Sequence, residues 1–229
     1  MISVRAAARE LNRTNGHIDA LLHIAAIFTI RYQKTKEGFE LMLATNHLGP
    51  FLFTNLLRDR LTPGGRVLTV TAPSTTRIEI DRLLNREHFN AMHSFGATKA
   101  ANLMFTFELA RRGHRWDIRA NAFHPGIVKS NLMRETPAFV RFVQQTFGSP
   151  PERAAHDLVD LALSPAHAAT PRALLPQPQE AQYGLNGKYS PLALRGSSSS
   201  GSADRLVWYL ARTSPMSARR RIARMICSV

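Results

Sequence analysis

The sequence predicts an α/β fold built on a parallel sheet, and two observations support this prediction. Short apolar runs alternate with longer stretches that have the periodicity of helices, and glycine or proline separates several of them. Strands that alternate with helices of this length are typical of a parallel sheet with helices on its faces. At 229 residues and 44% hydrophobic content, the chain can bury one sizeable core. We therefore expect one α/β domain over most of the chain.

The expected elements follow one another in a regular order. Buried strands are predicted at 18–27, 66–71 and 118–124, and helices at 3–11, 39–57, 95–111 and 149–163. The second strand follows a Pro63-Gly64-Gly65 turn, and the third stops at Pro125-Gly126. Ser149-Pro150-Pro151-Glu152 has the spacing of a capping box, which predicts where the last helix begins.

Composition divides the chain into three parts. Residues 1–192 carry the alternating pattern, residues 193–203 are rich in serine and glycine and form the expected linker, and residues 204–229 combine an expected helix with a basic tail. The formal net charge is +14, and the densest basic block is Arg219-Arg220-Arg221. It is interpreted as a solvated tail or as a contact with nucleic acid or an anionic membrane. Because no aromatic residues are interleaved with it, we do not expect a nucleic-acid partner.

Other classes of site and compartment are constrained by what the sequence contains. The single cysteine, Cys227, excludes an internal disulfide framework and suits a reducing cytoplasm, which is the expected location. No apolar run is long enough to cross a bilayer, so no transmembrane segment is expected. The histidines, the cysteine and the carboxylates have no spacing typical of a metal site, so no metal is expected.

Three phrases carry a resemblance to a known family. They are Thr45-Asn46-His47-Leu48-Gly49, Ser94-Phe95-Gly96-Ala97-Thr98-Lys99 and Asn121-Ala122-Phe123-His124-Pro125-Gly126. With the surrounding pattern, from about Ser3 to Tyr189, they resemble successive segments of the short-chain dehydrogenase/reductase family. The similarity is greatest to its retinol dehydrogenase and WW-domain oxidoreductase branch. The resemblance implies a doubly wound, Rossmann-like parallel sheet.

The front of that fold is not found in the sequence. Such folds begin with a strand, a glycine-rich turn and a helix that holds the dinucleotide pyrophosphate, and the chain contains no G-x-x-x-G-x-G or G-x-G-x-x-G run. The resemblance implies a partial sheet that lacks this first βαβ portion, and it leaves open whether a longer natural chain supplies it. Strand 18–27 would then be an edge, which predicts dimerisation, coverage by another segment or poor solubility.

Two of the family's catalytic positions are retained. In a working member, a tyrosine exchanges a proton with the substrate, and a lysine four residues later lowers the pKa of that tyrosine and holds the nicotinamide ribose. Lys99 matches this lysine, and Asn46 matches the family's helix asparagine. If a nicotinamide cofactor binds, the resemblance assigns the following residues to it: Lys99, Pro125, Gly126, Ile127 and Ser130.

Two other catalytic positions are replaced. Phe95 takes the place of the tyrosine, and Ala72 takes the place of the serine that hydrogen-bonds the substrate carbonyl. Ser74, or Thr71, is a candidate substitute for the lost serine hydroxyl. The family's Asn-Asn-Ala-Gly turn is represented by His23-Ile24-Ala25-Ala26, in which His23 is interpreted as a structural residue or as a new acid or base.

Residues 131–147 correspond to the family's variable lid over the substrate, and their apolar side chains predict either an apolar ligand or a helix core. We favour a degenerate family member that binds an apolar small molecule or catalyses a non-redox step, such as cyclisation or isomerisation, with no cofactor in this form. The first alternative is an oxidoreductase that uses NADP or NAD on a carbonyl or alcohol. The second is a homodimeric structural or interaction protein. Hydride transfer needs a bound nicotinamide and a proton relay, and the sequence shows neither intact.

Overall fold

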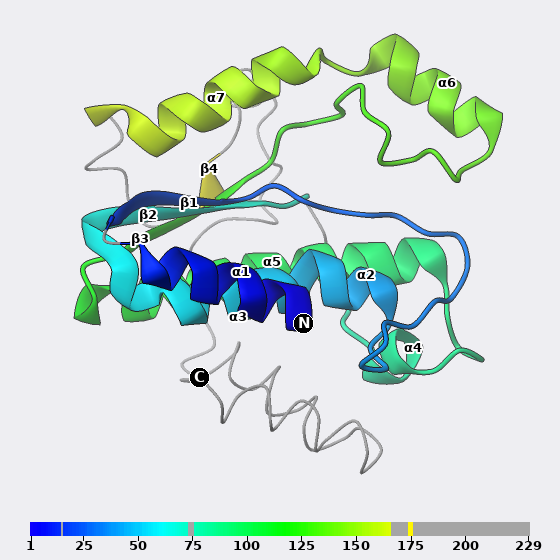
Figure 1. The fold of residues 1–229 in the computed structure, drawn as a ribbon. Coiled ribbons are helices and arrows are strands. Elements are labelled where there is room, and N and C mark those ends of the chain that lie inside the picture. The colour runs from blue at the N-terminus through cyan, green and yellow to red at the C-terminus, as the bar shows by residue number, and fades with distance from the viewer. Residues whose placement is uncertain (15, 73–75, 166–173, 176–229) are drawn as a thin grey trace.

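The computed structural model describes residues 1–14, 16–72, 76–165 and 174–175. Its four parallel strands lie in the order β1 (Ile18–His23), β2 (Leu61–Val70), β3 (Arg119–Phe123) and β4 (Leu174–Leu175). Helices lie on both faces of this sheet (Figure 1), with α1, α3 and α5 on one side and α7 on the other. The predicted α/β, Rossmann-like fold is confirmed.

Seven α-helices occur in the described part of the chain. They are α1 (Ile2–Arg13), α2 (Leu41–Leu43), α3 (Gly49–Leu57), α4 (Ile80–Leu84), α5 (Ala91–Arg112), α6 (Ala138–Phe147) and α7 (Pro151–Leu163). A π-helical turn, η1 (Ala44–Leu48), joins α2 to α3, so the helix expected at 39–57 forms with an irregularity in its middle. Two short 3-10 turns, η2 (Arg58–Arg60) and η3 (Gly113–Arg115), follow α3 and α5.

Two strands differ from their predicted bounds. The strand expected at 18–27 ends at His23, because beyond it the chain leaves the sheet and the side chain of Asn46 binds both backbone groups of Ile27. The expected Pro63-Gly64-Gly65 turn lies inside β2 as a bulge rather than before it. There the pairing passes from Ile18 with Leu61 to Ala20 with Arg66, and Gly64 has a φ of +76°, which suits glycine.

Apolar side chains leave the sheet on both faces, as a parallel sheet requires. On one face, Val67 of β2 belongs to a buried cluster with Leu57 of α3 and Phe105 of α5. On the other, Leu68 and its neighbour Phe123 pack against α7, through the residues Leu158 and Ala162. The core is therefore two layers thick and fixes the carboxyl ends of the strands, where the predicted site residues lie.

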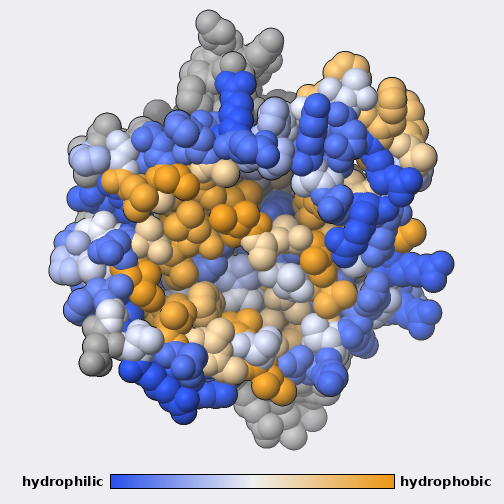
Figure 2. Space-filling model, turned by 45° about the horizontal axis from the view of Figure 1, so that its top comes forward, coloured by the Kyte–Doolittle hydropathy of each residue, from blue (hydrophilic) through white to orange (hydrophobic). Residues whose placement is uncertain are grey.

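Strand β1 is the edge of the sheet that the described residues form, as expected, because it pairs only with β2 there. Figure 2, which views the molecule partly from the side of α7, shows apolar side chains gathered around a hollow that hydrophilic residues border. The edge of β1, a mostly apolar strand that is unpaired on one side in the described sheet, is a template for another strand.

Candidate functional site

Lys99 lies in the first half of α5, and its side chain reaches the carboxyl end of β2. Its Nζ donates to the backbone oxygen of Val70 at 3.2 Å and lies 5.6 Å from the centroid of the Phe95 ring. Lys99 is only 4% exposed, and in the described part of the chain no carboxylate forms an ion pair with it. This burial lowers the pKa of Lys99 from 10.5 to about 8.

Phe95 makes the surroundings of this amine apolar. Its ring packs edge-to-face against the buried ring of Phe28, with centroids 5.6 Å apart. A phenyl ring has no proton to transfer, so the side chain at the family's tyrosine position contributes contact area and a π-face toward Lys99 but no acid. Phe95 itself is partly exposed, so Lys99 Nζ lies one side chain beneath the surface.

Asn46 lies in the π turn η1 and binds the segment that leaves β1. Its Oδ1 accepts from the N–H of Ile27 at 2.8 Å, and its Nδ2 donates to the oxygen of Ile27 at 3.0 Å and to Oγ1 of Thr98 at 3.2 Å. Thr98 precedes Lys99 on α5. The structure therefore brings Asn46 beside the lysine helix, but the three hydrogen bonds of its amide go to Ile27 and Thr98 and not to Lys99 itself.

The candidate substitute hydroxyls have other partners or lie elsewhere. Thr71 is buried and its Oγ1 donates to the backbone oxygen of Lys99 at 2.9 Å. Ala72 is partly exposed and offers no hydroxyl, while Ser74 lies outside the described residues. Of the two candidates, the one that the structure describes, Thr71, therefore already donates its hydroxyl proton to the backbone of Lys99.

The segment after β3 turns at Gly126, whose φ of +71° explains why glycine stands there. Ile127, the next residue, is 60% exposed, and its backbone oxygen accepts from the N–H of Ser149 at 2.8 Å. Ser130 Oγ accepts from Nε2 of Gln144 at 3.2 Å. Pro125, Gly126, Ile127 and Ser130 therefore form one connected stretch between β3 and α6.

The capping box expected at Ser149 does not form. Helix α7 begins at Pro151 as the pattern indicated, but its N-cap residue is Pro150, which has no side chain to donate or accept. The hydroxyl of Ser149 instead donates to the oxygen of Ile127 at 3.2 Å. The spacing located the helix correctly because proline favours the first turn, and Ser149 serves the neighbouring loop.

Helix α6 carries the apolar part of the predicted lid. Phe139, Phe142 and Phe147 are each at least 66% exposed, and none of the residues of α6 is buried. The described part of the chain therefore leaves the aromatic face of α6 exposed, and the helix-core interpretation finds no support there. An apolar ligand for this segment stays a prediction.

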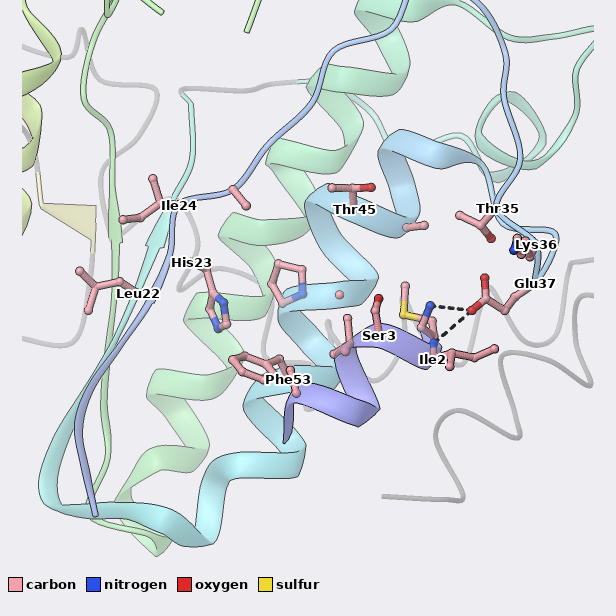
Figure 3. Close-up of a pocket in the computed structure, with 17 residues that line it drawn as sticks. Ile2, Ser3, Leu22, His23, Ile24, Thr35, Lys36, Glu37, Thr45 and Phe53 are labelled. Atoms are coloured by element: carbon pink, nitrogen blue, oxygen red, sulfur yellow. Dashed lines mark hydrogen bonds and ion pairs between the residues drawn. The ribbon is translucent and has the colours of Figure 1, made fainter. Parts of the chain in front are cut away.

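A cavity of about 880 Å³ lies between α1, the end of β1 and the helix that contains η1 and α3 (Figure 3). His23 lines it, and its Nε2 lies 2.6 Å from Oγ1 of Thr54. Burial lowers the pKa of His23 from 6.5 to about 4, so the ring is neutral at neutral pH. These contacts favour the structural interpretation of His23 over a role as acid or base.

Glu37, which the sequence reasoning missed, lies at the other end of this cavity. Its Oε1 accepts from the amino group of Met1 at 2.7 Å and from the N–H of Ile2 at 3.1 Å, as the dashed lines in Figure 3 mark. These bonds lower the pKa of Glu37 from 4.5 to about 2. A carboxylate at the N-terminus of α1 is favourable because the helix dipole is positive there. No local pattern connects residues so far apart in the sequence.

Two further observations concern the residues that the structure describes. No cluster of three or more histidine, cysteine or carboxylate side chains there has an arrangement that holds a metal ion. In the same part of the chain, no helix combines the length and the apolar composition needed to cross a bilayer.

A parallel sheet with helices on both faces places the chain in the class of doubly wound α/β proteins, in which ligands bind at the carboxyl ends of the strands. Lys99 reaches this edge from α5, at the end of β2. Residues 2–162 match the family model described as Enoyl-(Acyl carrier protein) reductase. The chain belongs to the short-chain dehydrogenase/reductase family.

Among curated proteins, the chain is similar to Retinol dehydrogenase 14 of Homo sapiens, at 36% identity over 173 residues that make up 71% of this chain and 52% of that protein. It is also similar to Retinol dehydrogenase 11 of Homo sapiens, at 32% identity over 169 residues, which are 71% of this chain and 53% of that protein. The chain therefore spans about half the length of the curated relatives it matches.

The fold is likewise similar to solved structures of the family. A short-chain dehydrogenase from Burkholderia cenocepacia J2315, in complex with NADP, gives a TM-score of 0.58 and 22% identity, and the match covers 76% of this chain and 70% of that one. At this identity the likeness concerns the fold alone.

The family implies a nicotinamide dinucleotide, and the described residues fit only one end of it. The resemblance assigns the nicotinamide to Lys99 and to the stretch from Pro125 to Ser130, and this assignment stays a prediction. A pyrophosphate needs closely approaching backbone N–H groups, normally supplied by a glycine-rich turn. In the described part of the chain the glycines with positive φ are Gly38, Gly64 and Gly126, which lie far apart in the sequence and form no such turn.

Proposed function

We propose that this chain is a degenerate short-chain dehydrogenase/reductase that binds an apolar small molecule and does not carry out the family's redox reaction. The observation that carries this proposal is the Phe95 ring 5.6 Å from Nζ of Lys99, at the position where the family has its proton donor. Removing a proton-transfer residue commonly costs about 10²–10⁴ in rate. Thr71, whose hydroxyl is bonded to the backbone of Lys99, offers no compensation.

What remains at the site favours binding and polar catalysis. Lys99 keeps donor capacity beyond its one bond to Val70, so it is able to donate to a carbonyl oxygen and polarise it. Phe95 and Phe28 supply apolar contact beside that donor. A lysine that polarises a carbonyl in apolar surroundings suits a non-redox step, such as cyclisation or isomerisation, that needs no hydride.

The second candidate function is that of an oxidoreductase acting on a carbonyl or alcohol with NADP or NAD. Family membership favours it, as do the retained Lys99 and Asn46. The relatives named retinol dehydrogenases are consistent with an apolar substrate. This function requires a pyrophosphate site and a proton donor. Residues other than the described ones would have to supply both.

A third candidate is a homodimer that pairs across β1. The observation in its favour is that β1 has a strand partner on one side only in the described sheet. The molecular mass in solution, measured over a range of concentrations by sedimentation, tests it directly. A mass that stays at one chain would contradict it.

Calorimetric titration of the 229-residue chain with NADPH and with NADH tests the main proposal. The far-ultraviolet circular dichroism spectrum of the same sample establishes that it is folded. We expect no heat of binding from a folded chain. Binding at micromolar concentration that is weakened by Lys99→Met, but not by Lys34→Met, would overturn the proposal and favour the oxidoreductase. Lys34 is the matched control because it is an exposed lysine whose Nζ also lies 5.6 Å from an aromatic ring centroid.

A further inference from the structure

The amine of Lys99 has an unusual combination of neighbours. A buried lysine normally has a carboxylate partner, because an unpaired ammonium is costly to bury. In the described part of the chain, Lys99 has instead one backbone oxygen, that of Val70, and the face of the Phe95 ring. Both neighbours tolerate a neutral amine as well as an ammonium group.

This environment favours the neutral amine. Desolvation of Lys99 is the cause that lowers its pKa to about 8, so about half of the molecules carry a free lone pair at pH 8. At the ordinary lysine pKa of 10.5, the neutral fraction at this pH is less than about 1%. Desolvated lysines of this kind are the ones that form Schiff bases with carbonyl compounds.

The position of the amine also allows an approach from outside. Lys99 Nζ lies at the carboxyl end of β2, which is the edge where ligands of doubly wound folds enter. Phe95, whose ring faces the amine, is partly exposed, so the side chain next to the amine borders solvent. An incoming aldehyde would meet the edge-to-face pair of Phe95 and Phe28, which suits an apolar chain.

We propose that Lys99 is an amine nucleophile that captures apolar aldehydes as imines. Its lone pair forms a C–N bond with the carbonyl carbon as the C=O π bond breaks, and a proton moves from the nitrogen to the oxygen to give a carbinolamine. The hydroxyl then leaves with the remaining N–H proton as water, which forms the C=N bond, and hydrolysis reverses the reaction. The step consumes no oxidant or reductant. This inference deepens the proposed function, on whose site it rests, by naming the substrate class.

Reductive trapping tests the inference on the 229-residue protein. The folded chain is incubated with hexanal and sodium cyanoborohydride, which reduces an imine to a stable secondary amine, and peptide mass mapping then gives the modification rate of each lysine. At pH 8 we expect Lys99 to react at least about tenfold faster than Lys34, the exposed lysine beside Tyr32. Its rate should rise as the pH increases from 7 to 9. Modification of Lys99 at a rate equal to or below that of Lys34 would overturn the inference.

The variant Phe95→Ala makes the test sharper. Phe95→Ala widens the approach, so Lys99 should react faster in it than in the parent, while Lys34 reacts as before. If Lys99 is modified only in Phe95→Ala, the amine is shielded in the natural protein and the inference is wrong. Nucleotide binding decides the proposed function, and the reactivity of Lys99 decides this inference, so the two can fail separately. NADPH binding together with an unreactive Lys99 contradicts both the function and the inference, and a reactive Lys99 without NADPH binding supports both. NADPH binding together with a reactive Lys99 contradicts only the proposed function.

Discussion

Nδ2 of Asn46 lies 3.2 Å from Oγ1 of Thr98 and thereby joins the π turn η1 to helix α5 next to Lys99. The same amide group holds both backbone groups of Ile27, where the chain leaves the sheet. One side chain therefore connects three segments that are distant in the sequence. Single π turns within helices are frequent at functional sites, because the extra residue leaves backbone groups without their usual helical partners. In η1 the backbone oxygen of Asn46 accepts a hydrogen bond from Nδ2 of Asn102 at 2.8 Å.

Asn46→Ala should lower the free energy of unfolding by about 2–3 kcal/mol, because it leaves the N–H and oxygen of Ile27 without their partner in a partly buried place. The measurement is urea denaturation followed by circular dichroism. Asn55→Ala is the matched control, since Nδ2 of Asn55 bonds only to Phe51 one turn earlier in the same helix, and it should cost less than about 1 kcal/mol. Equal losses in the two variants would contradict the bridging role.

His47 predicts how stability depends on pH. Its ring is 2% exposed between Phe51 and Phe105, and this burial lowers its pKa from 6.5 to about 4. As the pH falls below 6.5, His47 takes up a proton in the unfolded chain but stays neutral in the folded chain. The contribution of His47 to stability is therefore complete above pH 6.5 and is lost between pH 6.5 and 4. The loss due to His47 should be about 3 kcal/mol.

Urea denaturation at a series of pH values checks this expectation. In His47→Gln the loss between pH 6.5 and 4 should shrink but not vanish, because His23 has its pKa lowered to about 4 as well. Glu37 acts in a separate window, since its pKa of about 2 makes its contribution disappear only as the pH falls below 4.5. An unchanged pH profile in His47→Gln would show that the histidine does not cause the effect.

The sequence predicted the order of strands and helices well, because it depends on local periodicity and on terminators such as Pro125-Gly126. The resemblance identified Lys99 as a retained family position, but only the structure shows that it reaches the end of β2. Two features could not be predicted because they depend on contacts distant in the sequence. Glu37 binds the start of α1 from 35 or 36 residues away, and the desolvation that lowers the pKa of Lys99 arises only from packing. Likewise, Ser149 has the spacing of a helix cap, but its hydroxyl donates to the backbone oxygen of Ile127, which is distant in the sequence.

Arg66 attaches α7 to the sheet. Its guanidinium donates to the oxygen of Leu161 at 2.7 Å and of Ser164 at 2.8 Å, so it satisfies carbonyls at the C-terminal end of the helix. Arg66→Met should lower the free energy of unfolding by about 1–3 kcal/mol and accelerate amide hydrogen exchange in α7 more than in α3. Arg9→Met, at an exposed position of α1, should change stability by less than about 0.5 kcal/mol. Uniform exchange in α7 and α3 of Arg66→Met would contradict this attachment.

Phe95→Tyr combined with Ala72→Ser should not restore carbonyl reduction to the 229-residue chain. The first change places a phenol beside Nζ of Lys99, and the second returns the serine that the family uses, so both lost hydroxyls are present again. The pyrophosphate still lacks its binding turn in this sequence, which contains no glycine-rich run of the dinucleotide-binding type.

The measurement is the consumption of NADPH in the presence of an apolar aldehyde, with the same double variant carrying Lys99→Met as the control. We expect the same background rate of NADPH consumption in the double variant and in the control. Proton transfer alone cannot reduce the aldehyde, because the hydride must come from a bound nicotinamide. Robust turnover that depends on Lys99 would mean that the nicotinamide binds without the glycine turn. The loss of activity would then be due to Phe95 and Ala72 alone.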